Sequence, residues 1–111
     1  MTSSDPAGEQ WYVLQHEPGP VLAGDGSVFA HPLFAEHVAF LQRLRQAGLL
    51  VAAGPLPDQD GAGMTVLRSS GDPDADEVHR LATEDDRSVA GGLLTVRVRP
   101  WRVMFSAQVV P

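Results

Sequence analysis

The chain has 111 residues, the size of one ordinary domain, and 43% of them are hydrophobic, enough for a folded core. Its net charge of −6 would repel phosphate backbones, and three arginines near the C-terminus (Arg97, Arg99 and Arg102) are more typical of a solvated strand face, so we expect no nucleic-acid partner. The absence of cysteine excludes disulfides, thiolate metal sites and cysteine nucleophiles.

The sequence also predicts where the protein resides and how it is divided. No apolar run approaches the ~20 residues that a membrane-spanning helix needs. The first ten residues are small, polar and acidic, without the basic and then apolar layout of a signal peptide, so we expect a cytoplasmic protein that does not bind membranes. We expect a disordered lead-in over residues 1–9, one folded domain over 10–106 and a tail over 107–111.

The first half of the chain predicts a strand followed by a helix. Residues 10–16 are rich in strand-forming side chains, and the prolines at 18 and 20 end that strand. After a loop over 21–30, a helix begins near Pro32 and stops at Gly48. Its apolar residues recur at three- and four-residue spacing: Leu33, Phe34, His37, Val38, Leu41 and Leu44.

The second half predicts a hairpin, a second helix and a last strand. Residues 49–53 and 64–68 form two strands joined by a turn over 58–63. Asp72, Pro73 and Asp74 begin the second helix, whose narrow apolar stripe is Val78, Leu81 and Ala82. After an acidic break, Leu94, Val96 and Val98 alternate with polar residues as in a two-faced strand. Residues 101–105 either extend this strand or form a fifth one.

The predicted order is β-α-β-β-α-β, an α+β fold of the ferredoxin-like class. In this arrangement two helices cover one face of a four-stranded antiparallel sheet. The other face of the sheet must then meet either water or a second subunit.

His37 is the first candidate for chemistry, because it lies on the apolar face of the first helix. It is either a hydrogen-bonded core histidine or a general acid or base. Asp86 is the second, in a run of three carboxylates whose repulsion would raise a pKa; the alternative is a solvated acidic turn.

His16, at the end of the first strand, is either another site residue or a group that hydrogen-bonds at the strand end. No two histidines have the spacing of a metal motif, so we expect no metal. No phosphate loop, dinucleotide fingerprint or nucleophile elbow occurs, so we expect no cofactor.

Three stretches resemble the YciI-like (YCII-related) family: HPLFAEHVAFLQRLRQAGLLVAAGPL, DQDGAGMTVLR and HRLATEDDRSVAGGLLTVRVRPW. The similarity runs from about Trp11 to Phe105 and includes a G-x-L-x-x-x-GP turn and a closing V-x-P-W. The resemblance implies a ferredoxin-like fold that pairs into a homodimer, a dimeric α+β barrel with facing sheets. It also implies an acid–base pair of a helix histidine, here His37, with an aspartate before the last strand.

The aspartate of that pair matches Asp86 by its distance from Gly92 and Leu93. The family usually has Asp-Pro at this position, whereas Arg87 follows here and Asp85 precedes, so Asp85 and Asp86 stay as alternatives. One branch of the family resembles dehydrochlorinases of aromatic degradation. The wider superfamily includes muconolactone isomerases and cofactor-free monooxygenases.

Our leading hypothesis is a cofactor-independent lyase, isomerase or dehydrohalogenase that transfers protons on a small cyclic or aromatic acid or ketone. His37 acts as base or acid and Asp86 fixes its tautomer. His16, Trp11 and Tyr12 line the pocket, and Arg97 or Arg99 holds an anionic group if its strand face turns inward. The alternatives are a non-catalytic ligand-binding or accessory dimer, favoured by the absence of a strong nucleophile, and a cofactor-free monooxygenase with an open apolar cavity.

Overall fold

The protein forms one antiparallel sheet covered by helices on one side. The computed structural model describes residues 8–22, 26–68 and 75–107. Its sheet has the order β2-β3-β1-β4, with β1 at Glu9–Pro18, β2 at Leu50–Pro55, β3 at Gly63–Arg68 and β4 at Leu94–Val103. This order confirms the predicted ferredoxin-like α+β fold.

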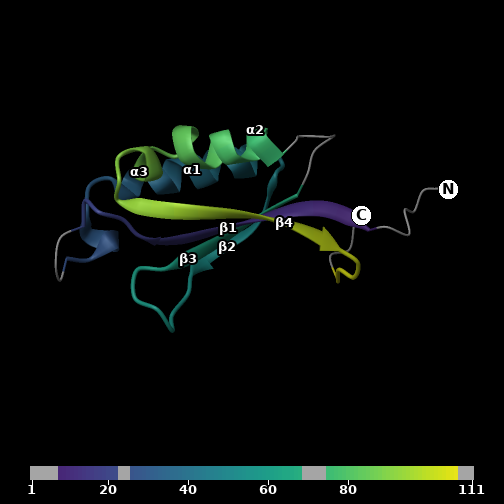
Figure 1. Ribbon diagram of the computed structural model, residues 1–111, viewed down its shortest axis with the longest axis horizontal. Coiled ribbons are helices and arrows are strands. Elements are labelled where there is room, and N and C mark those ends of the chain that lie inside the picture. The colour runs from purple at the N-terminus through teal and green to yellow at the C-terminus, as the bar shows by residue number, and fades with distance from the viewer. Residues whose placement is uncertain (1–7, 23–25, 69–74, 108–111) are drawn as a thin grey trace.

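Helices α1 (Phe34–Gln46), α2 (Ala75–Arg80) and α3 (Arg87–Ala90) all lie on the same side of the sheet (Figure 1). A short 3-10 helix, η1 (Val28–Ala30), precedes α1, and one π-helical turn, η2 (Leu81–Asp85), joins α2 to the segment that leads into α3. The sequence patterns predicted neither η2 nor α3. The predicted start of the second helix, residues 72–74, lies outside the described residues.

Gly48 ends α1 as predicted. Its φ of +78° is in the left-handed region, where a glycine avoids the penalty of a Cβ atom. The Leu49 N–H donates to the Leu44 carbonyl at 3.0 Å and the Gly48 N–H donates to the Arg45 carbonyl at 3.1 Å. These two bonds satisfy carbonyls that would otherwise be orphaned at the helix end.

Strands β1 and β4 pair along their whole length, from Glu9 opposite Val103 to Pro18 opposite Leu94. Trp101 lies within β4, opposite Trp11. Residues 101–103 therefore extend the fourth strand, which ends at Val103, and the described part of the chain holds no fifth strand.

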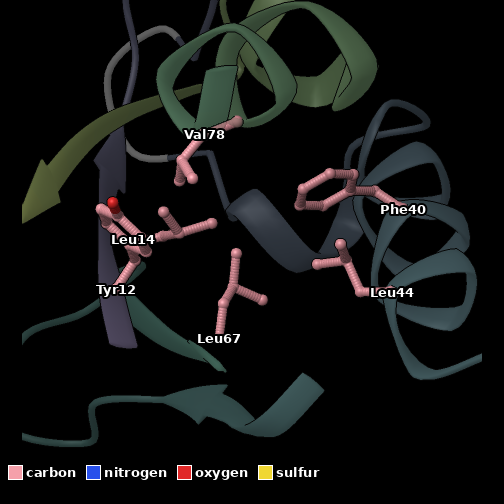
Figure 2. Packing of buried hydrophobic residues seen from close by; sticks show 7 residues of the cluster. Tyr12, Leu14, Phe40, Leu44, Leu67 and Val78 are labelled. Atoms are coloured by element: carbon pink, nitrogen blue, oxygen red, sulfur yellow. The ribbon is translucent and has the colours of Figure 1, made fainter. Parts of the chain in front are cut away.

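The main core lies between the helices and the sheet (Figure 2). Alternate residues of β1 point into it, because successive side chains of a strand face opposite sides. The buried members of this core are Tyr12, Leu14, Phe40, Leu44, Leu67, Val78 and Ala82. Phe40, which the predicted helical stripe left out, is 1% exposed, whereas Val38, which that stripe included, is 39% exposed. The predicted stripe is therefore wrong at these two positions, which face nearly opposite sides of the helix.

The opposite face of the sheet carries a second, smaller cluster. Trp11, Val66 and Val103 are buried there, and the ring of Trp101 meets that of Trp11 edge-on, with the centroids 5.7 Å apart. Trp101 keeps 44% of its surface exposed. In the described part of the chain no helix covers this face, and no helix is long and apolar enough to span a membrane.

We expect Phe40→Ala to lower the free energy of unfolding by about 3–5 kcal/mol, because it removes a buried ring from the main core and leaves a cavity. Val38→Ala, on the same helix but at an exposed position, should cost less than about 1 kcal/mol. Urea unfolding of both variants measures the difference, and equal losses would contradict this description of the core.

Candidate functional site

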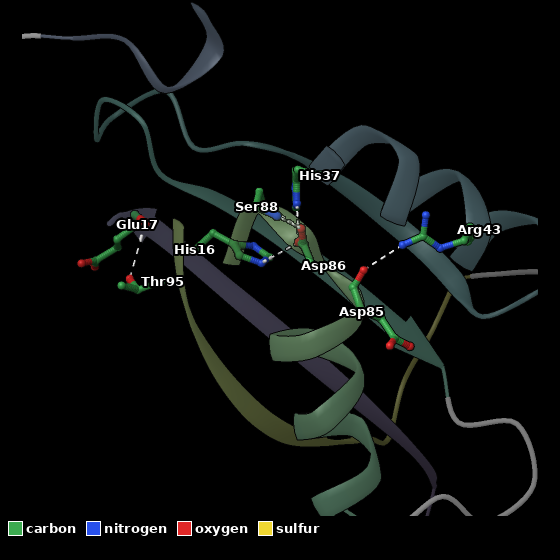
Figure 3. Close-up of polar contacts among 8 residues, drawn as sticks. All are labelled: His16, Glu17, His37, Arg43, Asp85, Asp86, Ser88 and Thr95. Atoms are coloured by element: carbon green, nitrogen blue, oxygen red, sulfur yellow. Dashed lines mark hydrogen bonds and ion pairs between the residues drawn. The ribbon is translucent and has the colours of Figure 1, made fainter. Parts of the chain in front are cut away.

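Three polar side chains are buried together between α1 and the sheet (Figure 3). His16 comes from the end of β1, His37 from the first turns of α1, and Asp86 from the single residue between η2 and α3. Their exposed fractions are 2%, 8% and 0%. Because burying polar groups costs free energy unless they are paired, the partners of these three side chains define the site.

His37 and Asp86 form a direct hydrogen bond. The distance between Nδ1 of His37 and Oδ2 of Asp86 is 2.7 Å, a short separation that is typical of a charge-assisted bond. The two residues are 49 positions apart, so the fold brings them together.

Ser88 satisfies the other carboxylate oxygen. The Ser88 backbone N–H donates to Oδ1 of Asp86 at 3.0 Å, and the Ser88 hydroxyl donates to the same oxygen at 2.6 Å. Asp86 is thereby the N-cap of α3, since an N-cap side chain accepts from the N–H two or three residues on. Ser88 is itself fully buried.

These contacts set the ionisation of Asp86. Burial alone would raise its pKa, but the hydrogen bonds from His37 and Ser88 act in the opposite direction and hold the pKa below its usual value. The expected rise from carboxylate repulsion is therefore wrong: Glu84 and Asp85 are exposed to water, whereas Asp86 turns inward. Asp86 is a carboxylate at neutral pH.

The ionised carboxylate determines the tautomer of His37. A carboxylate can only accept hydrogen bonds, so Nδ1 of His37 must carry the hydrogen at this 2.7 Å contact. In the neutral ring, Nε2 is then left with its lone pair. The pair has the arrangement in which a carboxylate orients an imidazole for proton transfer.

His16 is buried without a hydrogen-bond partner at either ring nitrogen. Its ring meets that of His37 edge-on at a centroid distance of 4.9 Å. Burial, followed by the nearby His37, lowers the pKa of His16 to about 4, although Asp86 acts to raise it. The 4.0 Å between Nε2 of His16 and Oδ2 of Asp86 is thus not an ion pair at neutral pH, and it is too long for a hydrogen bond.

A cavity of about 180 Å³ lies beside the two histidines. Its other lining residues are apolar or glycine: Val28, Phe29, Phe34, Leu41, Gly54, Pro55, Gly61, Ala62, Gly63, Met64 and Leu94. Asp86 does not line this cavity and reaches it only through His37. A dry cavity of ~150 Å³ can hold benzene, so this one has room for a single six-membered ring.

The structure distinguishes the two candidate aspartates. Asp86 contacts His37, whereas the backbone carbonyl of Asp85 accepts a 2.8 Å bond from Nη2 of Arg43 and the Asp85 side chain is exposed. Sequence reasoning did not identify Arg43 or Ser88. The Asp-x-Ser spacing is a helix-capping signal that could have indicated Ser88.

Tyr12, Arg97 and Arg99, predicted to bind substrate, lie away from this cavity. Tyr12 belongs to the main core and is 5% exposed.

The two arginines lie on the other face of the sheet. Arg97 is opposite Gln15 and Arg99 is opposite Val13, and these two residues of β1 alternate with its core-facing ones. Arg97 lines a separate cavity of about 270 Å³ that His16 also borders. Trp11 lies in the cluster on that other face.

Comparison with known proteins identifies a matching family and a solved structure with a similar fold. The family model of the YCII-related domain matches residues 30–102. No curated protein matches the chain. One similar solved structure is that of 5-chloro-2-hydroxyhydroquinone dehydrochlorinase (TftG) from Burkholderia phenoliruptrix AC1100, in complex with 2,5-dihydroxybenzoquinone. The two are 20% identical, with a TM-score of 0.56 over 81% of this chain and 92% of that one, a likeness that shows a shared fold.

We expect Asp86→Asn to change the tautomer of His37, because an amide can present an N–H where the carboxylate presented only acceptor oxygens. Nitrogen-resolved NMR of the imidazole should show Nδ1 protonated in the wild type and a larger share of Nε2–H in the variant. Asp85→Asn is the matched control and should leave the spectrum of His37 unchanged, since only the backbone of Asp85 makes the contact with Arg43. An unaltered His37 spectrum in Asp86→Asn would contradict the assigned hydrogen bond.

Proposed function

The chain belongs to the YCII-related domain family, and we propose that it is a cofactor-independent enzyme that transfers protons on a small ring compound, with His37 as the acid or base and Asp86 as its orienting partner. The observation that carries this proposal is the buried 2.7 Å bond between the two, with His37 lining a ring-sized cavity. Histidine is the commonest general acid or base in enzymes, and a hydrogen-bonded carboxylate fixes the tautomer and orientation that this role needs.

The proposed step begins with the free lone pair on Nε2 of His37. Nε2 removes a proton from an O–H or an activated C–H group of the ring, and the imidazolium that forms is stabilised by the Asp86 carboxylate. The electron pair left on the substrate forms a new double bond. It either expels a leaving group such as chloride, or it is returned when His37 delivers its proton to another atom of the ring. The first outcome is dehydrohalogenation or elimination, and the second is isomerisation.

The cavity favours an uncharged ring over an organic acid. None of its lining residues carries a cationic side chain, so a carboxylate inside it would stay unpaired, at a high cost in free energy. Arg97 and Arg99, the cations proposed for such a group, lie on the other face of the sheet. The similar dehydrochlorinase was solved with a ring compound that bears hydroxyl and keto oxygens, which supports ring ketones and phenols as the substrate class.

We also propose that the uncovered face of the sheet is the interface of a homodimer. This face carries the Trp11, Val66 and Val103 cluster, and Trp101 keeps 44% of its surface exposed beside it. A half-exposed tryptophan beside an apolar cluster, on a sheet face that no described helix covers, supports a subunit contact at this face. A second copy would cover it with the same side chains, as a two-fold interface requires.

The enzyme proposal is tested by two assays: chloride release from 5-chloro-2-hydroxyhydroquinone, and uptake of solvent deuterium into small cyclic ketones. We expect a measurable rate in at least one assay and a fall of about 100- to 10,000-fold in His37→Gln, the usual contribution of a general acid or base. Asp86→Asn should also be slow.

His79→Gln, an exposed histidine outside the site, is the control and should keep the wild-type rate. Tight binding of these ring compounds with no turnover, or turnover that survives His37→Gln, would count against the enzyme and in favour of the ligand-binding alternative.

The dimer proposal is tested by light scattering coupled to size exclusion. We expect the wild type to have the mass of two chains and Trp101→Asp to have the mass of one, because a carboxylate buried in an apolar interface is strongly unfavourable. Val38→Asp places the same charge on an exposed position of α1 and should remain dimeric. A monomeric wild type would overturn this proposal.

A further inference from the structure

His16 is the one buried side chain of the described site whose polar atoms the fold leaves unsatisfied. Neither ring nitrogen has a partner, although the residue is 2% exposed. A buried donor or acceptor without a partner is unfavourable to folding, and a leucine at this position would avoid that cost. The acid–base pair does not use His16, so its nitrogens are open to another partner.

The nearest polar groups to that ring are the two other members of the site. One ligand atom from each of His16, His37 and Asp86 lies within 4.8 Å of the other two. The closest pair is Nδ1 of His37 and Oδ2 of Asp86 at 2.7 Å, and Nε2 of His16 is 4.0 Å from the same oxygen. Half of 4.8 Å is about 2.4 Å, so an ion among the three atoms needs the side chains to close in by a few tenths of an ångström to reach the ~2.0–2.2 Å of zinc–nitrogen and zinc–oxygen bonds.

We propose that His16, His37 and Asp86 form a binding site for one divalent transition-metal ion of the zinc type. Two imidazoles and one carboxylate are ligands that zinc and cobalt bind well, whereas magnesium and calcium prefer oxygen atoms alone. Three protein ligands leave a fourth position open, and both histidines line the cavity, so water or a ligand oxygen can complete the coordination.

The site also has an outer contact of the kind that metal centres use. The Ser88 hydroxyl and backbone N–H both hold Oδ1 of Asp86, which leaves Oδ2 directed at the histidines. Hydrogen bonds of this type orient a ligating carboxylate and are worth about 10- to 100-fold in metal affinity.

This inference goes beyond the proposed proton transfer, because the two uses of the site exclude each other. The metal takes the lone pair of Nδ1 on His37, so the hydrogen of the neutral ring moves from Nδ1 to Nε2, with no net loss of a proton and no change in oxidation state. The hydrogen bond between His37 and Asp86 is then replaced by two metal–ligand bonds. Zinc is therefore expected to inhibit the acid–base reaction.

The test is calorimetric titration of the full chain, free of any affinity tag, with Zn²⁺ and separately with Mg²⁺. We expect one Zn²⁺ per chain with a dissociation constant in the micromolar range or tighter, and no response to Mg²⁺. The binding heat should vary little across buffers of different ionisation enthalpy, because two neutral imidazoles and an ionised carboxylate release no proton when they bind the ion. His16→Leu should weaken Zn²⁺ binding more than about 100-fold, beyond what losing an outer contact costs.

The matched control is His79→Leu, which removes an exposed histidine and should leave the affinity for Zn²⁺ unchanged. Thermal unfolding provides a second measurement: without metal, His16→Leu should melt at or above the wild-type temperature, and Zn²⁺ should raise the melting temperature of the wild type alone. Zinc binding that survives His16→Leu, or that is lost in His79→Leu, would overturn the site. Because binding is measured without substrate, an inactive protein that binds zinc contradicts only the proposed enzyme, and an active protein that does not bind zinc contradicts only the metal site.

Discussion

The local structure around the site depends on keeping one carboxylate ionised without contact with water. Asp86 is 0% exposed, and transferring a charged group out of water costs several kcal/mol unless partners replace its hydration. Three donors do so here: Nδ1 of His37 on one oxygen, and the N–H and hydroxyl of Ser88 on the other. Each donor comes from a specific place in the fold, so the requirement constrains several elements at once.

The chain around Asp86 shows what that constraint requires. The π-helical turn η2 ends at Asp85, and the backbone leaves the helical region at Asp86, where φ is −85° and ψ is 102°. Single π-helical turns are frequently found at functional sites. On one side Arg43 of α1 holds the Asp85 carbonyl, and on the other side α3 begins with Asp86 as its cap. Helix α1 therefore makes two hydrogen bonds to this segment, from His37 to the Asp86 carboxylate and from Arg43 to the Asp85 carbonyl.

The sequence predicted those parts of the protein that follow from periodicity and from local backbone preference. Strand-forming residues indicated β1, alternation indicated β4, and Gly48 in the left-handed region ended α1. Val78 of α2 and Ala82 of η2 are buried in the main core, as their predicted apolar stripe requires. The error on α1 has a simple cause. Val38 and Phe40 lie 200° apart on a helix at 100° per residue, and only the position of the sheet decides which of them is buried.

The site was harder to predict, because its partners are distant in sequence or depend on backbone details. His37 was selected for its apolar surroundings, and the resemblance to the YCII-related family supplied an aspartate, but spacing could not separate Asp85 from Asp86. Only the turn at η2 places one inward and the other in water. The same holds for Arg97 and Arg99: their alternation on β4 was correct, but which face meets the helices is set by pairing with β1.

His16 shows why a search for spaced metal motifs did not find this cluster. Its partners are 21 and 70 residues away, on α1 and beside α3, so no short pattern connects them. Burying an imidazole without a hydrogen-bond partner is unfavourable to folding. The His16 ring nevertheless lies next to the His37–Asp86 pair and lines a cavity whose other lining residues are uncharged. A stable core does not need this combination, since a leucine would pack there at lower cost. The unpaired nitrogens of His16 are accounted for by the proposed metal ion, which would reach both histidines from the cavity that they line.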